Sequence, residues 1–153
     1  MALNIGSKSL KSTNLAGLMN RSLKSTLGSS RAFHWSSPRA VLYVNGDKDI
    51  FSKAIQSKDR ITVVDFHADW CGPCHALGPV LEKLTNEPNK SASGLPFDLV
   101  KIDTDSEDGQ VLGGTYKIRA LPTVMAFRDG ALISQFVGAL PEPSVQDFLS
   151  KLE

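Results

Sequence analysis

From residue 41 onward the chain alternates between two spacings of apolar residues, and this alternation predicts strands interleaved with helices. Short runs of β-branched and aromatic residues bounded by polar residues or glycine indicate buried strands. Apolar residues at steps of three and four indicate helices. Strands are predicted at 41–44, 61–66, 97–102, 124–127 and 132–137, and helices after Asp47, after Cys74, over 106–117 and over 143–152.

The order of these elements predicts the fold class. Strands and helices alternate up to the last two strands, which flank Arg128-Asp129-Gly130, a sequence typical of a hairpin turn. This order favours a single α/β domain with a central mixed β-sheet and helices on both faces. The segment 86–96 contains two prolines, a glycine and several serines, so we expect a surface loop there.

The first forty residues differ in composition from the rest. No acidic residue precedes Asp47, serines and basic residues are frequent, and Leu15, Met19, Leu23 and Leu27 form an apolar stripe at helical spacing. This composition is typical of a mitochondrial transit peptide. We therefore expect residues 1–36 to be a transit peptide that is removed in the matrix, and 37–153 to form the domain. A disordered basic tail, a nucleic-acid-binding tail and a chloroplast address are the alternatives, and the cytoplasm is a further location to test.

The overall charge and hydropathy of the chain do not favour a highly charged partner or a membrane. Seventeen basic and sixteen acidic residues give a formal net charge of +1, and 41% of the chain is hydrophobic. The longest apolar stretch is too short for a membrane span or for the core of a secretory signal. We expect a monomeric domain that binds neither nucleic acid nor a membrane.

The two cysteines of the chain, Cys71 and Cys74, stand where the predicted strand 61–66 gives way to a helix. A helix N-terminus favours an anion, which lowers the pKa of a thiol, so Cys71 is the candidate nucleophile. Cys74 falls on the same side of the first turn, close enough for a disulfide, and is expected to be the less exposed of the two. Gly72 lets the backbone bend, and Pro73 is tolerated in a first helical turn.

Three other interpretations of the cysteine pair remain open. A zinc site needs four ligands, and beyond the cysteines only His34, His67 and His75 are candidates in a pattern without metal-binding spacing. A structural disulfide across so short a loop would constrain the unfolded chain little. The third possibility is a pair of buried, unreactive thiols.

Three further residues, Asp65, Trp70 and Pro122, each allow more than one interpretation. Asp65 shares a strand face with the apolar residues before it, so we expect burial to raise the pKa of its carboxyl; an exposed strand-end aspartate is the alternative. Trp70 is either a flat exposed contact for a protein substrate or a core residue. Pro122 follows Leu121 before a strand, and statistics alone favour a trans peptide bond there.

An ordered set of motifs resembles the thioredoxin family, in particular its mitochondrial members. The matching residues are Val64-Asp65-Phe66, Ala68, Asp69-Trp70-Cys71-Gly72-Pro73-Cys74, Pro79, Leu121-Pro122-Thr123, Asp129-Gly130 and Val137-Gly138-Ala139. The resemblance covers about residues 41–153 and implies a thioredoxin fold. It implies that Asp65 is the base for Cys74 and that the Leu121-Pro122 bond is cis and faces the dithiol. It also implies that Trp70, Gly72, Pro73, Leu121, Pro122 and Gly138 support the site or contact substrate.

The resemblance also implies a function. The chain would be a protein-disulfide reductase with no bound cofactor, in which Cys71 attacks a substrate disulfide and Cys74 resolves the mixed disulfide. The Cys71-Cys74 disulfide would be reduced by NADPH through a thioredoxin reductase, and peroxiredoxins and methionine sulfoxide reductases would receive the electrons. The alternatives are a disulfide oxidase or isomerase, and a non-catalytic binding module.

Three positions depart from the family pattern. His67 stands where many relatives have an aromatic residue, and His75 stands where a lysine or arginine is common. His75 is expected to be solvated, with stabilisation of the Cys71 thiolate as the alternative. Leu99 is expected at the position where some relatives place a lysine near the aspartate, with Lys101 as a substitute two residues along.

Overall fold

The computed structural model describes residues 39–86 and 91–153, which belong to one compact unit, Trp35–Glu153. The predicted transit peptide, residues 1–36, and residues 87–90 of the predicted loop lie outside the described residues. The boundary at residue 37 therefore stays a prediction.

The described residues form a mixed five-stranded sheet in the order β1-β3-β2-β4-β5. Its strands are β1 (Leu42–Tyr43), β2 (Ile61–His67), β3 (Phe97–Asp103), β4 (Thr123–Arg128) and β5 (Ala131–Val137). Strand β3 runs parallel to β1 and β2, whereas β4 is antiparallel to both β2 and β5. Strand β2 is thus central, which explains why its residues 61–66 are all buried.

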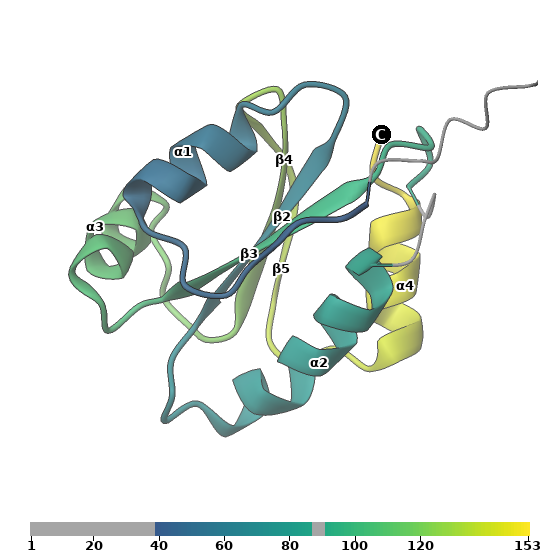
Figure 1. Cartoon of the computed structure of the whole chain (residues 1–153). Coiled ribbons are helices and arrows are strands. Elements are labelled where there is room, and N and C mark those ends of the chain that lie inside the picture. Colours follow the sequence, from purple (N-terminus) through teal and green to yellow (C-terminus); the bar gives the residue numbers. More distant parts are fainter. Residues whose placement is uncertain (1–38, 87–90) are drawn as a thin grey trace, which may run out of the picture. The chain divides into compact units, whose positions relative to one another are not determined.

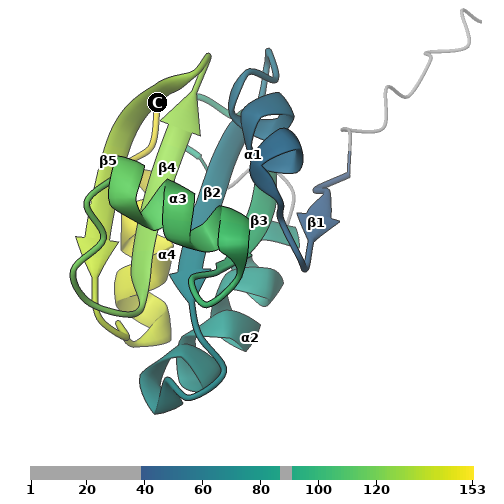
Figure 2. The same cartoon turned by 90° about the vertical axis from the view of Figure 1, so that its left-hand side faces the viewer.

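Two helices cover each face of the sheet (Figures 1 and 2). Helices α1 (Lys48–Ile55) and α3 (Glu107–Thr115) lie on one face, and α2 (Gly72–Asn86) and α4 (Glu142–Ser150) on the other. Asp47 and Ser106 cap α1 and α3, because their side chains accept the backbone N–H groups three residues along. The predicted α/β architecture is confirmed.

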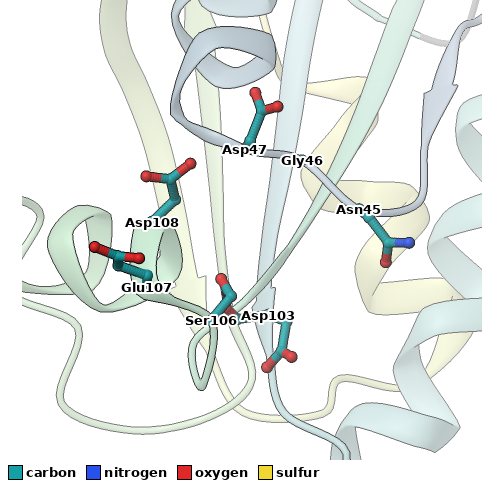
Figure 3. Close-up of a pocket in the computed structure, with 7 residues that line it drawn as sticks. All are labelled: Asn45, Gly46, Asp47, Asp103, Ser106, Glu107 and Asp108. Atoms are coloured by element: carbon teal, nitrogen blue, oxygen red, sulfur yellow. Dashed lines mark hydrogen bonds between the residues drawn. The ribbon is translucent and has the colours of Figure 1, made fainter.

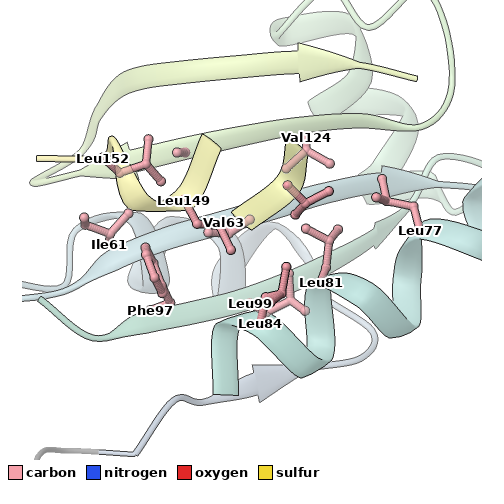
Figure 4. Packing of buried hydrophobic residues seen from close by; sticks show 12 residues of the cluster. Ile61, Val63, Leu77, Leu81, Leu84, Phe97, Leu99, Val124, Leu149 and Leu152 are labelled. Atoms are coloured by element: carbon pink, nitrogen blue, oxygen red, sulfur yellow. The ribbon is translucent and has the colours of Figure 1, made fainter. Parts of the chain in front are cut away.

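Side chains along β2 alternate between the two faces of the sheet. Ile61 and Val63 pack with α2 and α4, as Figure 4 shows, whereas Val64 and Phe66 pack with α1 and α3. Full burial of one such side chain contributes about 1.5–3 kcal/mol, so both faces hold the strand in register. Asp65 lies on the same strand face as Ile61 and Val63, as predicted, and side chains of α2 line the pocket that contains it.

The elements differ from the predictions mainly at their ends. Strand β1 is two residues long, because only Leu42 and Tyr43 pair with β3 at this edge of the sheet. Helix α3 runs through Gly113-Gly114, and the last turn closes when the N–H of Tyr116 donates to the carbonyl of Leu112. Leu152 is buried as predicted but lies beyond the end of α4.

Candidate active site

The cysteine pair lies where β2 has ended and α2 begins. Helix α2 starts at Gly72, and Cys71 and Cys74 form a disulfide with their Cα atoms 5.3 Å apart. The backbone N–H of Cys74 donates to Cys71 Sγ at 3.3 Å and is shared with the carbonyl of Cys71 at 3.0 Å, so one N–H group of the first turn is directed partly at that sulfur. The same contact would stabilise a Cys71 thiolate, because an N–H at a helix start favours negative charge.

The expected difference in exposure between the two cysteines is wrong. Both are 5% exposed in the disulfide form, because Ala68 and Leu121 pack against the pair. Gly72 and Pro73, which separate the cysteines, are exposed. Access to the disulfide is therefore governed by the side chains around it rather than by depth along the helix.

Trp70 forms the exposed wall of the site. Its side chain is 72% exposed, which confirms the surface position over the core alternative. The indole Nε1–H donates to Asp105 Oδ2 at 2.8 Å. Asp105 had no signal in the sequence, because it lies 35 residues along the chain, beyond β3.

A groove of about 590 Å³ begins at Trp70 and is bordered by α3 and the segment 117–121. Leu121 lines it at one end, and Lys117 and Arg119 are exposed basic residues that also line it. An indole beside a partly apolar groove is suited to contact an extended protein segment.

Pro122 follows Leu121, which packs against the cysteine pair. The Leu121-Pro122 peptide bond is cis, as the family resemblance implied and against the statistical expectation for such bonds. The N–H of Gly138 donates to the carbonyl of Pro122 at 2.8 Å, and Gly138 has a φ of 95°, a conformation that favours glycine. The start of β4 and the end of β5 are thereby tied together next to the cysteines.

Asp65 lies beneath the helix start. It is 1% exposed and lines a pocket of about 340 Å³ together with Cys74. Burial raises the pKa of its carboxyl to about 6, Lys101 opposes the rise and Glu82 adds to it. The raised pKa predicted from the strand pattern is confirmed, and a carboxyl with a pKa near 6 suits proton transfer close to neutral pH.

The position opposite Asp65, which the sequence analysis gave to Leu99, is held by Lys101, the residue named there as its substitute. Lys101 pairs directly with Asp65 in the parallel ladder of β2 and β3, while Leu99 pairs with Val63. The error was one of register, which a single sequence does not reveal. Lys101 Nζ donates to Glu82 Oε1 at 2.9 Å.

Glu82 was missed by the sequence analysis, although a signal existed. Cys74, Gly78 and Glu82 follow each other at steps of four along α2, and all three line the pocket that contains Asp65. Side chains four apart lie on one helix face. A search along that face from Cys74 would have found the carboxylate.

The two histidines near the site differ in their surroundings. His67 lines the same pocket as Asp65, and burial, with Lys101 next in importance, lowers the pKa of its imidazole. His75 is exposed, as expected, and its Nε2–H donates to the carbonyl of Asp69 at 2.7 Å.

A separate acidic hollow of about 450 Å³ lies between the start of α1 and the start of α3, as Figure 3 shows. Two of its carboxylates already accept backbone N–H groups: Asp47 caps α1, and Asp108 Oδ2 accepts the N–H of Lys48 at 3.2 Å. Within residues 39–86 and 91–153 no group of three or more histidine, cysteine or acidic side chains is arranged to hold a metal ion.

Among the helices of the described residues, none has the length and apolar character needed to cross a membrane.

Comparisons with known proteins agree with this geometry. The family model for thioredoxin matches residues 41–151. "Probable thioredoxin-2" of Caenorhabditis elegans is 41% identical over 131 residues, which is 84% of this chain and 85% of that protein. "Thioredoxin, mitochondrial" of Rattus norvegicus is 34% identical over 130 residues, 85% of this chain and 74% of that protein.

Among solved structures, a mutant thioredoxin from Halobacterium salinarum superposes with a TM-score of 0.60 at 33% identity. The match covers 74% of this chain and 91% of that one. A family model that spans most of the domain, relatives matched along most of their length and a cysteine pair joined at a helix start lead to one conclusion. The chain belongs to the thioredoxin family and is a thiol–disulfide oxidoreductase.

Proposed function

We propose that the protein is a protein-disulfide reductase in which Cys71 attacks and Cys74 resolves. The observation that carries the proposal is the N–H of Cys74 directed at Cys71 Sγ at the start of α2. The Cys71 thiolate attacks a substrate disulfide and displaces one substrate thiolate, which leaves a mixed disulfide. The Cys74 thiol gives its proton to Asp65, and its sulfur then attacks Cys71 Sγ. The second substrate thiolate leaves, and the protein retains the Cys71-Cys74 disulfide.

The surroundings of the disulfide support a protein substrate. Trp70, Gly72, Pro73, Leu121, Pro122 and Gly138 are the proposed supporting and contact residues. Trp70 offers an exposed aromatic surface beside the groove toward Leu121. The hydrogen bond from the N–H of Gly138 to the carbonyl of Pro122 joins the start of β4 to the end of β5 beside Leu121. An extended segment next to the substrate disulfide would lie across this surface.

The electron supply is also a proposal. The protein would hold no bound cofactor, and its disulfide would be reduced by NADPH through a thioredoxin reductase. Peroxiredoxins and methionine sulfoxide reductases are the proposed recipients. Trapping tests the recipients: in a Cys74→Ser variant the mixed disulfide is not resolved, so partners stay covalently bound to Cys71, whereas a Cys71→Ser variant should trap none.

For location we propose the mitochondrial matrix, with residues 1–36 as the transit peptide. The basic composition before Asp47, which includes no acidic residue, supports this location. The similarity to the rat protein named "Thioredoxin, mitochondrial" supports it as well. Import of the full chain into isolated mitochondria, followed by N-terminal sequencing of the product, tests it. Import should require a membrane potential and yield a chain that begins near residue 37; a full-length product outside the matrix would contradict the proposal.

The activity is tested by NADPH consumption when the full chain is mixed with a thioredoxin reductase and a protein disulfide such as insulin. Turnover should be lost in Cys71→Ser. A binding module would keep its partner and show no turnover even before mutation. A disulfide oxidase would oxidise a reduced protein substrate faster than it reduces a disulfide.

A further inference from the structure

Two buried polar atoms of β2 have no hydrogen-bond partner within the described part of the chain: Asp65 Oδ1 and His67 Nε2. Buried polar groups are almost always hydrogen-bonded, to protein or to water. Both residues line the pocket of about 340 Å³ that also contains Cys74. A polar pocket of this size has room for several water molecules, each of which occupies about 30 Å³ in the liquid. Water in this pocket would satisfy both atoms.

The geometry of β2 places the two side chains at a distance that water bridges. Asp65 and His67 are alternate residues of one strand, so they point to the same face at a spacing of about 7 Å. The backbone of His67 is held in place, because its carbonyl accepts the N–H and the Oγ1–H of Thr104 at 2.8 and 3.0 Å. Asp69 and His75 line the same pocket and are exposed, so the pocket reaches solvent beyond His67.

Proton balance requires a route out of this pocket. The inference rests on the function proposed above, in which each turnover moves one proton from the Cys74 thiol to Asp65. Asp65 is 1% exposed and has no direct contact with bulk solvent. It must nevertheless release that proton before the next cycle and accept one when the disulfide is reduced again.

We propose that His67 relays protons between the carboxyl of Asp65 and bulk solvent through water in the pocket. It is a positioning residue, because it acts through water and Asp65 and does not touch the reacting sulfur atoms. A neutral imidazole accepts a proton on one ring nitrogen and releases one from the other, so the ring stays neutral but changes tautomer. The inward transfer that follows when the disulfide is reduced restores the first tautomer. No electron moves in this step. The proton from Cys74 leaves Asp65 for water, passes His67 and reaches solvent at the exposed rim.

The charges around the two groups are compatible with this role. Asp65 faces Lys101 on β3 and Glu82 on α2, while His67 faces Lys101 and Asp103 on β3, Asp69 in the loop and His75 on α2. The lowered pKa of the imidazole keeps His67 neutral near pH 7, so it is free to accept a proton. The raised pKa of Asp65 brings the two groups closer in basicity, which eases transfer between them.

The test separates the two chemical steps in the full-length protein. Attack by Cys71 is measured as the rate of mixed-disulfide formation in a Cys74→Ser background. Resolution is measured by stopped flow in a single turnover of the intact dithiol. His67→Gln keeps a polar side chain of similar length but does not relay a proton. Asn45→Ala is the matched control, since it also removes a polar side chain that lines the pocket.

We expect His67→Gln to slow resolution about tenfold at pH 7, with attack unchanged, because a positioned proton carrier is worth at least that much. Added imidazole buffer should restore the rate at constant pH, a response that a merely structural role would not give. Asn45→Ala should resolve at the wild-type rate.

The relay would be wrong if His67→Gln resolved within about twofold of wild type and ignored imidazole, or if both steps slowed equally. These results would leave the reductase function intact, because the wild-type chain would still turn over. Failure of the proposed function has a different signature: the wild-type chain would not reduce the substrate at all.

Discussion

Lys101 lies directly opposite Asp65 across the parallel pair β2 and β3, yet its ammonium group is bonded to Glu82, with Nζ and Oε1 2.9 Å apart. The buried carboxyl therefore has a cation close by without an ion pair of its own. This arrangement explains why burial outweighs Lys101 and the pKa of Asp65 is raised to about 6. Two of the predictions below follow from it.

Asp65→Asn should stabilise the oxidised protein above pH 6. The pKa of Asp65 rises from 3.8 in its ordinary state to about 6 in the fold, so the folded state holds this proton more tightly than the unfolded state. Wild-type stability consequently falls as the pH rises from 3.8 through about 6 and then levels off. The variant lacks this loss and should gain about 1–3 kcal/mol at pH 7.5, which is the free energy of the pKa shift less the cost of placing an amide where the carboxyl was.

Denaturant unfolding at several pH values measures this gain. The difference in free energy of unfolding between Asp65→Asn and wild type should vanish below the ordinary pKa of 3.8. There the carboxyl of Asp65 is protonated in both the folded and the unfolded state. A difference that stayed constant from pH 3 to pH 8 would show that packing, not ionisation, is responsible.

Glu82→Gln and Lys101→Met should move the pKa of Asp65 in opposite directions. Removal of the Glu82 charge lowers the pKa of Asp65, and removal of the Lys101 charge raises it. The midpoint of the pH profile for resolution, or an NMR titration of the Asp65 carboxyl, measures both shifts. Shifts of the same sign in the two variants would mean that the Lys101–Glu82 pair acts through structure and not through charge.

Asp105→Ala should weaken the recognition of protein substrates without impairing the dithiol. Asp105 holds the exposed indole of Trp70 by one hydrogen bond of 2.8 Å, so its removal frees the ring to adopt other rotamers. We expect a KM for a protein disulfide that is about threefold to tenfold higher, with kcat little changed.

A small disulfide reagent is the control for this variant, because it needs no surface contact. Its rate should be the same in wild type and in Asp105→Ala. Trp70→Ala should raise the KM for the protein substrate further still. Equal losses with the small reagent and with the protein would show that Asp105 affects the cysteines themselves.

Gly109→Ala should destabilise the domain by at least about 2 kcal/mol, because a close backbone contact must open. A Cβ at this position would lie 1.8 Å from the carbonyl oxygen of Asp103. Gly114→Ala is the matched control in the same helix, since a Cβ there meets no atom within 4 Å. It should leave stability unchanged or raise it by up to about 1 kcal/mol.

Thermal or denaturant unfolding of the two glycine variants checks this pair. A loss of stability of similar size in both variants would mean that helix α3 tolerates a side chain at neither position, and that the contact with Asp103 is not the cause. Little loss in Gly109→Ala would mean that α3 shifts away from Asp103 at low cost.

Local patterns were enough to predict the order of elements and the place of the cysteines. The β-branched run 61–66 and the helical spacing after Cys74 each depend on neighbours within a few residues, and both are confirmed. The face of Asp65 followed from alternation with Ile61 and Val63 in the same strand. These features are recorded in short stretches of sequence because strand and helix periodicities are local properties of the backbone.

Contacts between distant segments were beyond such patterns. Lys101 faces Asp65 because of the register between β2 and β3, and a shift of two residues would have placed Leu99 there with the same alternation. Asp105, which follows β3, accepts the indole N–H of Trp70, which follows the neighbouring strand β2, and Leu121 packs against the cysteine pair.

Residue types and their local spacing thus determined which chemistry the chain carries. The packing of strands and helices decided how that chemistry is tuned, because burial, charge and access depend on which distant side chains meet.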